Sequence, residues 1–168
     1  MNRPQPKDYH EMVSGYISLV EGDNVLEVLK QQSTDFPDFL NSLIEKADYA
    51  YATGKWTIKE MVGHIIDTER ILTYRLLCIA RGEQNPLPGF EENAYVEQAH
   101  FADRSLLSLS EEFSLLRKAN LYLYNSLNAQ ELQRTGTAAG RQLTVNALLF
   151  TIAGHLIHHT QIIKERYL

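Results

Sequence analysis

The chain has little of several features that mark other classes of protein. It contains one cysteine, Cys78, so an internal disulfide is excluded. Its longest apolar stretch, residues 147–153, is far shorter than the ~20 residues that a membrane-spanning helix needs. Lys and Arg number 16 against 21 Asp and Glu, for a formal charge of -5, and this balance lacks the clustered positive charge that binds nucleic acid. We therefore expect no disulfide framework, no membrane span and no nucleic-acid partner.

The beginning of the chain also lacks the apolar segment of a secretory signal, since residues 1–6 are polar and include two prolines. Together with the single cysteine, this favours a cytoplasmic location. A length of 168 residues suits one domain with a substantial core. We divide the chain into an N-terminal arm, residues 1–22, and a single domain, residues 23–168.

Apolar residues recur at helical spacing along the chain, and no alternating pattern predicts a strand. Helices are expected at 24–32 and 35–47, as a first helix broken or kinked near Pro37, and at 57–81, 105–126 and 144–167. Between them lie a long connection at 83–104, a capped turn at 128–132 and a loop at 134–140. The expected fold is all-α, a four-helix bundle with a long crossover connection.

The last helix carries histidine where apolar residues would complete its core-facing stripe. His155 and His159 are four residues apart and share this stripe with Leu148, Ile152 and Ile162. Two imidazoles at this spacing can share one metal ion, but two ligands are too few. The remaining histidines are His10, His64, His100 and His158, of which His64 alone lies inside another strongly periodic helix.

Three segments together resemble the DinB/YfiT-like superfamily of metalloenzymes. They are Gly-Lys-Trp-Thr at 54–57, Gly-His-Ile-Ile-Asp-Thr-Glu-Arg at 63–70, and His-x-x-His-His-x-Gln-Ile at 155–162. The resemblance covers roughly residues 20–168. It implies a helical bundle that holds a divalent metal, zinc or nickel in many members, through His64, His155 and His159.

The resemblance also implies a small-molecule substrate, since some members are thiol S-transferases that use a low-molecular-weight thiol and others are regarded as metal-dependent hydrolases. Three neutral imidazoles leave a divalent ion with an open position for a water or a thiol. The residues do not choose between thiol transfer and hydrolysis. Two further interpretations stay open: a non-catalytic metal- or ligand-binding bundle, and a metal-free scaffold with hydrogen-bonded core histidines.

No catalytic base can be assigned from the sequence. Leu156 stands where His-Glu-x-x-His proteases carry their general base, which disfavours that mechanism. Asp67 and Glu69 follow His64 in sequence but point about 60 and 140 degrees away from it on a helix of ~3.6 residues per turn. We therefore assign both carboxylates supporting or inter-helix roles.

Other residues receive a weaker functional interpretation. His158 is expected beside the metal ligands without binding, and His10 and His100 in surface loops. Trp56 and Tyr51 could close over the site, although we favour a core role for them. Finally, Ile66 and Leu77 extend the apolar surface of the second helix beyond its main stripe and hint at a homodimer face.

Overall fold

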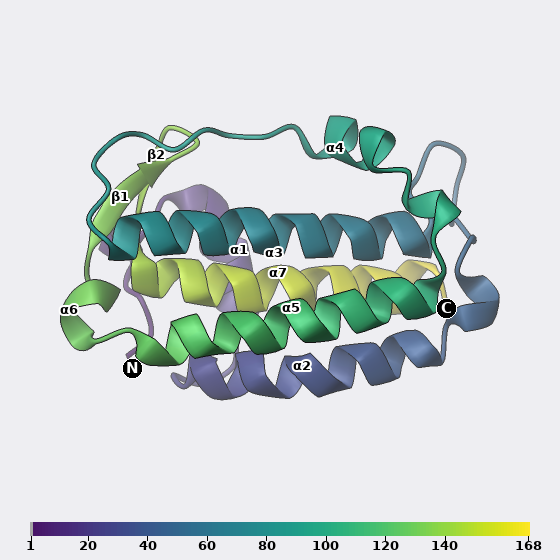
Figure 1. Ribbon diagram of the computed structural model, residues 1–168, viewed down its shortest axis with the longest axis horizontal. Coiled ribbons are helices and arrows are strands. Elements are labelled where there is room, and N and C mark those ends of the chain that lie inside the picture. Colours follow the sequence, from purple (N-terminus) through teal and green to yellow (C-terminus); the bar gives the residue numbers. More distant parts are fainter. Residues whose placement is uncertain (1) are drawn as a thin grey trace.

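The computed structural model describes residues 2–168 and is dominated by helices (Figure 1). The helices are α1 (Ser14–Leu19), α2 (Val25–Asn41), α3 (Ile58–Ala80), α4 (Glu92–Ala99), α5 (Leu106–Ser126), α6 (Ala129–Leu132) and α7 (Val145–Arg166), and the strands are β1 (Thr135–Ala138) and β2 (Arg141–Thr144).

Four long helices, α2, α3, α5 and α7, form the expected four-helix bundle. The pairs α2 with α5 and α3 with α7 pack closely, and α3 also packs on α5. The colours of Figure 1 show that α2 and α7 run in one direction whereas α3 and α5 run in the other. Because α3 and α5 are parallel, the chain between them must return along the whole length of the bundle. The fold class and its long crossover are thus confirmed.

The first bundle helix is continuous, so the expected break near Pro37 is wrong. α2 runs through Pro37 from Val25 to Asn41. A proline inside a helix leaves the carbonyl four residues earlier without its usual partner. Here the Ser33 carbonyl accepts a hydrogen bond from the Ser114 hydroxyl of α5, at 3.4 Å. The neighbouring helix therefore satisfies the group that the proline leaves free.

The crossover between α3 and α5 contains helical structure that the sequence pattern did not predict. α4 lies within it, followed by a 3₁₀ turn at Phe101–Asp103. The Phe101 ring packs against Gly63 of α3, where an added Cβ would stand 2.3 Å from the ring. In Figure 1 this segment passes along the outer side of α3. The broad apolar surface of α3 therefore faces the crossover.

Residues 134–140, expected as a loop, contribute instead to a hairpin of two antiparallel strands. Thr135 pairs with Thr144, and Ala138 pairs with Arg141. Ala139 and Gly140 both have positive φ, 51° and 75°, as in the tight two-residue turns that suit the twist of a hairpin. Leu87 of the crossover bonds to the edge of β1, its N–H to the Thr137 carbonyl at 2.9 Å. The hairpin therefore anchors one end of the crossover.

The N-terminal residues pack on the last helix. α1 lies along α7, and Ile17 is buried in the core. Arg3 fastens this segment by donating to the carbonyls of Ile17 and Val20, both at 2.6 Å. Within the described residues, no helix has the length and apolarity needed to cross a membrane.

Candidate metal centre

His64 on α3 faces His155 and His159 on α7, and the three imidazoles form one buried cluster. Both helices begin at well-formed caps: Thr57 and Glu60 make a reciprocal capping box on α3, and the Thr144 hydroxyl accepts from the Ala147 N–H on α7. These caps fix where each helix starts, and hence which residues of the antiparallel pair lie opposite each other. The three histidines are 3–8% exposed.

The ring nitrogens lie at the separations expected of ligands to a common ion. The Nε2 atoms of His64 and His155 are 3.1 Å apart, and those of His155 and His159 are 3.0 Å apart. All three ligand atoms lie within 4.8 Å of one another. Nitrogens bound tetrahedrally at ~2.0–2.1 Å from zinc would be about 3.3 Å apart. The donor set therefore fits a small divalent cation.

Burial keeps these imidazoles neutral near pH 7. Loss of solvation lowers the pKa of His64 to about 4 and that of His159 to about 3. The pKa of His155 is lowered well below its usual value, first by burial and then by its histidine neighbours. A neutral imidazole offers a lone pair, which is the form that binds a metal. The electrostatics thus agree with the distances.

Hydrogen bonding within the cluster is incomplete. His159 Nδ1 is buried and has no hydrogen-bond partner among residues 2–168. His64 Nδ1 has only a long contact with the Thr68 hydroxyl, at 3.5 Å. The interpretation of these histidines as fully hydrogen-bonded core residues therefore fails for His159.

A glycine precedes a ligand histidine on each helix, and each lets another segment approach the site. An added Cβ at Gly154 would stand 1.9 Å from the Tyr16 carbonyl oxygen of α1. The close approach places the Tyr16 ring edge-on to His155 and His158, with centroids 5.5 and 5.4 Å away. Gly63, which precedes His64, likewise leaves room for the Phe101 ring to approach α3. Tyr16 was missed from the sequence because nothing local connects the arm to α7.

Trp56 covers part of the cluster beside His64. The Trp56 ring lies 4.8 Å from the His64 ring, centroid to centroid. Trp56 therefore also covers the site, in addition to the core role that we favoured from the sequence. His158 lies beside His159, centroids 5.0 Å apart, outside the cluster of three. This agrees with its expected supporting position.

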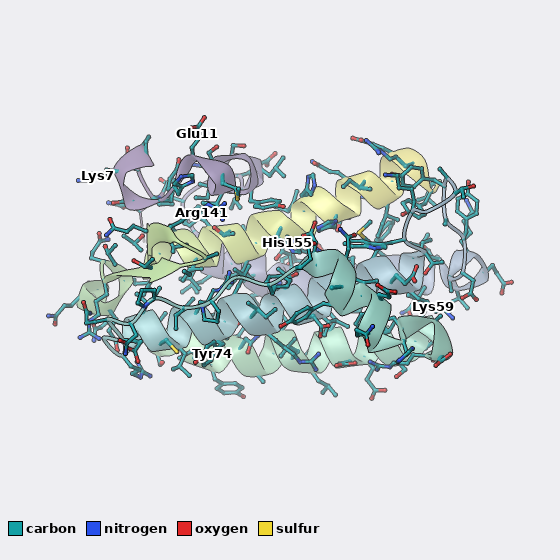
Figure 2. The ribbon with its side chains drawn as sticks, turned by 90° about the horizontal axis from the view of Figure 1, so that it is seen from above. Lys7, Glu11, Lys59, Tyr74, Arg141 and His155 are labelled. Atoms are coloured by element: carbon teal, nitrogen blue, oxygen red, sulfur yellow. The ribbon has the colours of Figure 1, made fainter. Side chains whose placement is uncertain are left out.

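Two cavities reach the histidines from different sides. One of about 200 Å³ is lined by both His64 and His155, together with residues of α1, the crossover and the hairpin. The other, of about 440 Å³, is lined by His159, His158 and Trp56. In the view of Figure 2, α1 lies beside α7, which carries His155, and Arg141 marks the hairpin near the first cavity. Solutes can therefore approach the cluster even though it is buried.

The remaining sequence candidates lie elsewhere. Glu69 forms an ion pair with Arg117 of α5, and Asp67 forms one with Arg70, so neither carboxylate serves the histidines. His100 is exposed after α4, as expected, whereas His10, also exposed, lines the smaller cavity. Ile66 is fully buried and cannot belong to a dimer face.

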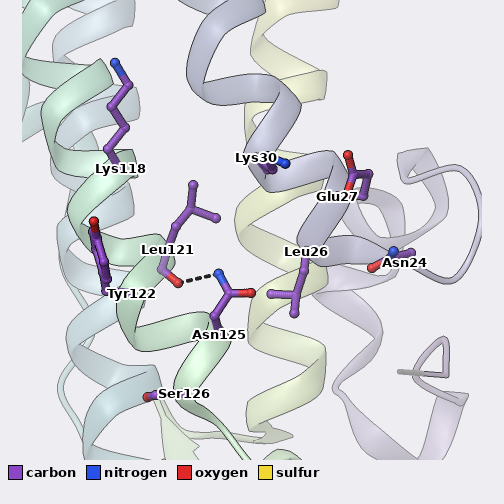
Figure 3. A pocket seen from close by; sticks show the side chains of 9 residues that line it. All are labelled: Asn24, Leu26, Glu27, Lys30, Lys118, Leu121, Tyr122, Asn125 and Ser126. Carbon is purple, nitrogen blue, oxygen red and sulfur yellow. Dashed lines mark hydrogen bonds between the residues drawn. The ribbon is translucent and has the colours of Figure 1, made fainter.

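A groove of about 910 Å³, larger than either cavity at the histidines, lies between α2 and α5. Figure 3 shows its lining, in which Asn125 donates to the Leu121 carbonyl at 2.7 Å. It shares no residue with the histidine cluster, and its charged side chains, Glu27, Lys30 and Lys118, form no ion pair among the described residues. Size alone therefore does not make it the candidate site.

The fold and cluster define a helical-bundle protein with a candidate three-histidine metal centre. Residues 28–163 match the model of the DinB superfamily, and the chain belongs to that family. The solved structure of YfiT from Bacillus subtilis is similar, with a TM-score of 0.69 and 19% sequence identity over 96% of this chain and 91% of YfiT. YfiT is described as a probable metal-dependent hydrolase with an unusual four-helix bundle topology. At this identity the likeness concerns the fold. A comparison with curated proteins gave no match.

Proposed function

We propose that the protein is a metal-dependent enzyme in which His64, His155 and His159 hold one divalent ion, zinc or nickel, and act on a small molecule. The observation that carries this proposal is the close grouping of three neutral imidazoles: their Nε2 atoms lie 3.1 Å (His64–His155) and 3.0 Å (His155–His159) apart, and all three ligand atoms lie within 4.8 Å of one another. Without a cation, the Nε2 of His155 has one hydrogen or one lone pair for two contacts, so it cannot satisfy both His64 and His159. The membership of the DinB superfamily adds support.

The residues around the cluster would control which molecules reach the bound ion. When bound, the ion would lower the pKa of a water or thiol at its remaining position and so supply a nucleophile. Trp56 and Tyr16 cover the imidazoles and limit access of bulk water, while the cavity at His64 and His155 admits the substrate. The buried imidazoles stay neutral and do not exchange protons near pH 7.

Thiol transfer and hydrolysis remain the two candidate reactions. Hydrolysis is favoured by the description of YfiT. Thiol transfer is favoured because the cavity at His64 has no buried carboxylate in its lining, and a metal-bound thiol needs no such base. A cytoplasmic location, a homodimer and the division at residue 22 stay predictions.

Elemental analysis of untagged protein tests the proposal. We expect one divalent ion per chain in the wild type and none in His64→Ala or in His155→Ala/His159→Ala, with His158→Ala as the matched control that keeps its ion. The loaded protein is then assayed with p-nitrophenyl acetate for hydrolysis and with a thiol plus 1-chloro-2,4-dinitrobenzene for transfer. Wild-type protein that takes up no zinc or nickel would overturn the proposal, and a bound ion without either activity would favour the non-catalytic alternative.

A further inference from the structure

Arg75 is a buried cation without a counter-charge. Its side chain is 8% exposed, and it forms no ion pair with a carboxylate among residues 2–168. Burial lowers its pKa and no acidic neighbour offsets this, although a guanidinium keeps its charge in proteins. Its one hydrogen bond is from Nη2 to the Pro88 carbonyl, at 2.7 Å. Most of its donors are therefore available to a ligand.

Arg75 lines the 200 Å³ cavity of the candidate metal ligands, and it also lines a neighbouring cavity of about 260 Å³ together with Pro88 and Phe90. Antiparallel α3 and α7 line this cavity with matching residue types: His64 and His155, then Thr68 and Thr151, then Leu72 and Leu148. Arg75 follows Leu72 on the same stripe of α3. The cavity thus has imidazoles at one end, then two threonines and two leucines, and a guanidinium at the other end.

Charges around the cavity favour an anion at the Arg75 end. Arg141 of the hairpin is a second cation in the lining, and Glu92 is the single acidic residue there. Glu92 is exposed to solvent and acts on Tyr16, whose pKa is raised first by burial and then by the charge of Glu92. Tyr16 lies beside His155, at the other end of the cavity. The Arg75 guanidinium carbon lies over the ring of Phe90 in the crossover, 5.9 Å from the ring centroid.

We propose that the substrate is a small anion, with a carboxylate bound by Arg75 and a short apolar chain that carries the reacting group to the histidines. The metal end of this inference rests on the proposed function. The cavity is smaller than the ~300–1,000 Å³ usual for drug-sized ligands, which agrees with a short chain. The Cα atoms of His64 and Arg75 are about 16 Å apart along α3, at ~1.5 Å per residue, so the ligand needs several bonds to reach both ends.

The alternative is that Arg75 only ties the crossover to α3 through Pro88. That role uses one of five guanidinium donors and would be served equally by a neutral donor. It predicts that replacing Arg75 lowers stability and leaves ligand selectivity unchanged. Ligand selectivity, measured on folded variants, therefore separates the two roles.

The test uses cobalt-loaded protein and two matched series of thiols. ω-Mercaptoalkanoates, from mercaptoacetate to 6-mercaptohexanoate, are compared with ω-mercaptoalkanols of equal length, and binding is followed by the thiolate-to-cobalt absorption band. In the wild type, the best-fitting carboxylate should bind about tenfold tighter than its alcohol, as expected for a hydrogen bond to a charged group. Arg75→Met should abolish this preference, Arg75→Lys should keep part of it, and Arg81→Met, on the exposed end of α3, should leave it intact.

The outcomes separate this inference from the metal proposal. The anion subsite alone is overturned if the protein takes up cobalt but binds carboxylate and alcohol thiols with equal affinity. It is also overturned if the preference for carboxylate thiols persists in Arg75→Met. Absence of cobalt uptake overturns the metal site. In that case hexanoate and 1-hexanol are titrated calorimetrically into metal-free protein. A preference for hexanoate that Arg75→Met removes supports the subsite. Equal binding of the two compounds overturns it. Circular dichroism confirms that each variant is folded.

Discussion

Two buried polar clusters lie within the same helical bundle and differ in how completely they are satisfied. Arg117 of α5 binds both carboxylate oxygens of Glu69 at 2.7 Å, and its remaining nitrogen donates to Gln32 and to the Leu29 carbonyl. Asn120 donates to Glu69 as well. In the histidine cluster, three Nε2 atoms crowd together and His159 Nδ1 has no partner among the described residues.

The difference indicates two separate roles. The Glu69–Arg117 cluster is balanced in charge and complete in hydrogen bonds, so it needs nothing from outside the chain. In the histidine cluster, the Nε2 of His155 can serve only one of its two imidazole contacts and His159 Nδ1 has no partner among the described residues, so a cation would complete it. The first cluster is therefore expected to govern the stability of the protein, and the second to govern its binding of metal.

Breaking the Glu69–Arg117 cluster should give the largest loss of stability. Arg117→Met leaves the Glu69 carboxylate buried and unpaired, which typically costs about 3–5 kcal/mol of unfolding free energy. Metal content per folded chain should stay unchanged. Urea denaturation measures the loss, and the control is Arg70→Gln, which removes two partly exposed ion pairs, to Asp67 and Glu112, and should cost about 1 kcal/mol or less. Loss of metal in folded Arg117→Met would contradict the separation of roles.

Acid should destabilise the metal-free protein through the histidine cluster. The pKa of His64 is about 4 when folded and near 6.5 when unfolded, so only the unfolded chain takes up this proton as the pH falls between these values. The unfolding free energy should therefore decline from about pH 6.5 to pH 4, by on the order of 1 kcal/mol per pH unit for this residue. Urea titrations of wild type and His64→Gln at several pH values isolate the contribution. Equal slopes would show that His64 has no lowered pKa.

Zinc should stabilise the wild type but not a variant that lacks one ligand. A free zinc concentration of 100 times Kd adds about 2.7 kcal/mol to the unfolding free energy, and His155→Leu should lose this gain. Without zinc, the same variant should stay within about 1.5 kcal/mol of wild type, because the swap keeps an apolar volume in the core. Thermal unfolding with and without zinc makes the comparison. A large loss of unfolding free energy in metal-free His155→Leu would show that the histidines have a structural role, like Arg117.

Closing the gap that Gly154 leaves for α1 should cost less stability than breaking the Glu69–Arg117 cluster. In Gly154→Ala the new Cβ would stand 1.9 Å from the Tyr16 carbonyl oxygen, so α1 must shift, at a cost of about 1–3 kcal/mol. The matched control is Gly15→Ala in α1, whose Cβ would meet nothing within 4 Å. Tyrosine fluorescence and urea denaturation report the shift and its cost. Equal stability of the two variants would show that α1 does not depend on this close approach.

Residue spacing was enough to predict the bundle and the pairing of His155 with His159. The caps at Thr57, Ser105 and Thr144 start the long helices where the sequence placed them, and spacing of four residues brings His155 and His159 together. The assignment of His64 as the third ligand came from the family resemblance as well as from its helix. The approach of His64 to His155 depends on how α3 packs against α7, which helical periodicity alone does not predict.

Other features depend on contacts between distant segments. The hairpin lacks an Asn-Gly turn and an apolar alternation, and it is held partly by Leu87 of the crossover. α2 continues through Pro37 because Ser114 of another helix bonds to the freed carbonyl. Arg75 received no role from the sequence, since only the fold shows that it is buried without a carboxylate partner.

The central claim, that the three imidazoles form one cation site, is tested most directly by nitrogen NMR of the histidine side chains. Long-range correlation spectra of uniformly ¹⁵N-labelled protein, assigned with single histidine variants, report each ring nitrogen before and after one equivalent of zinc. The account predicts that the Nε2 resonances of His64, His155 and His159 shift together to metal-bound positions, while those of His10, His100 and His158 do not. Zinc that shifts none of the three, or binds at His10 or His158 instead, would contradict it.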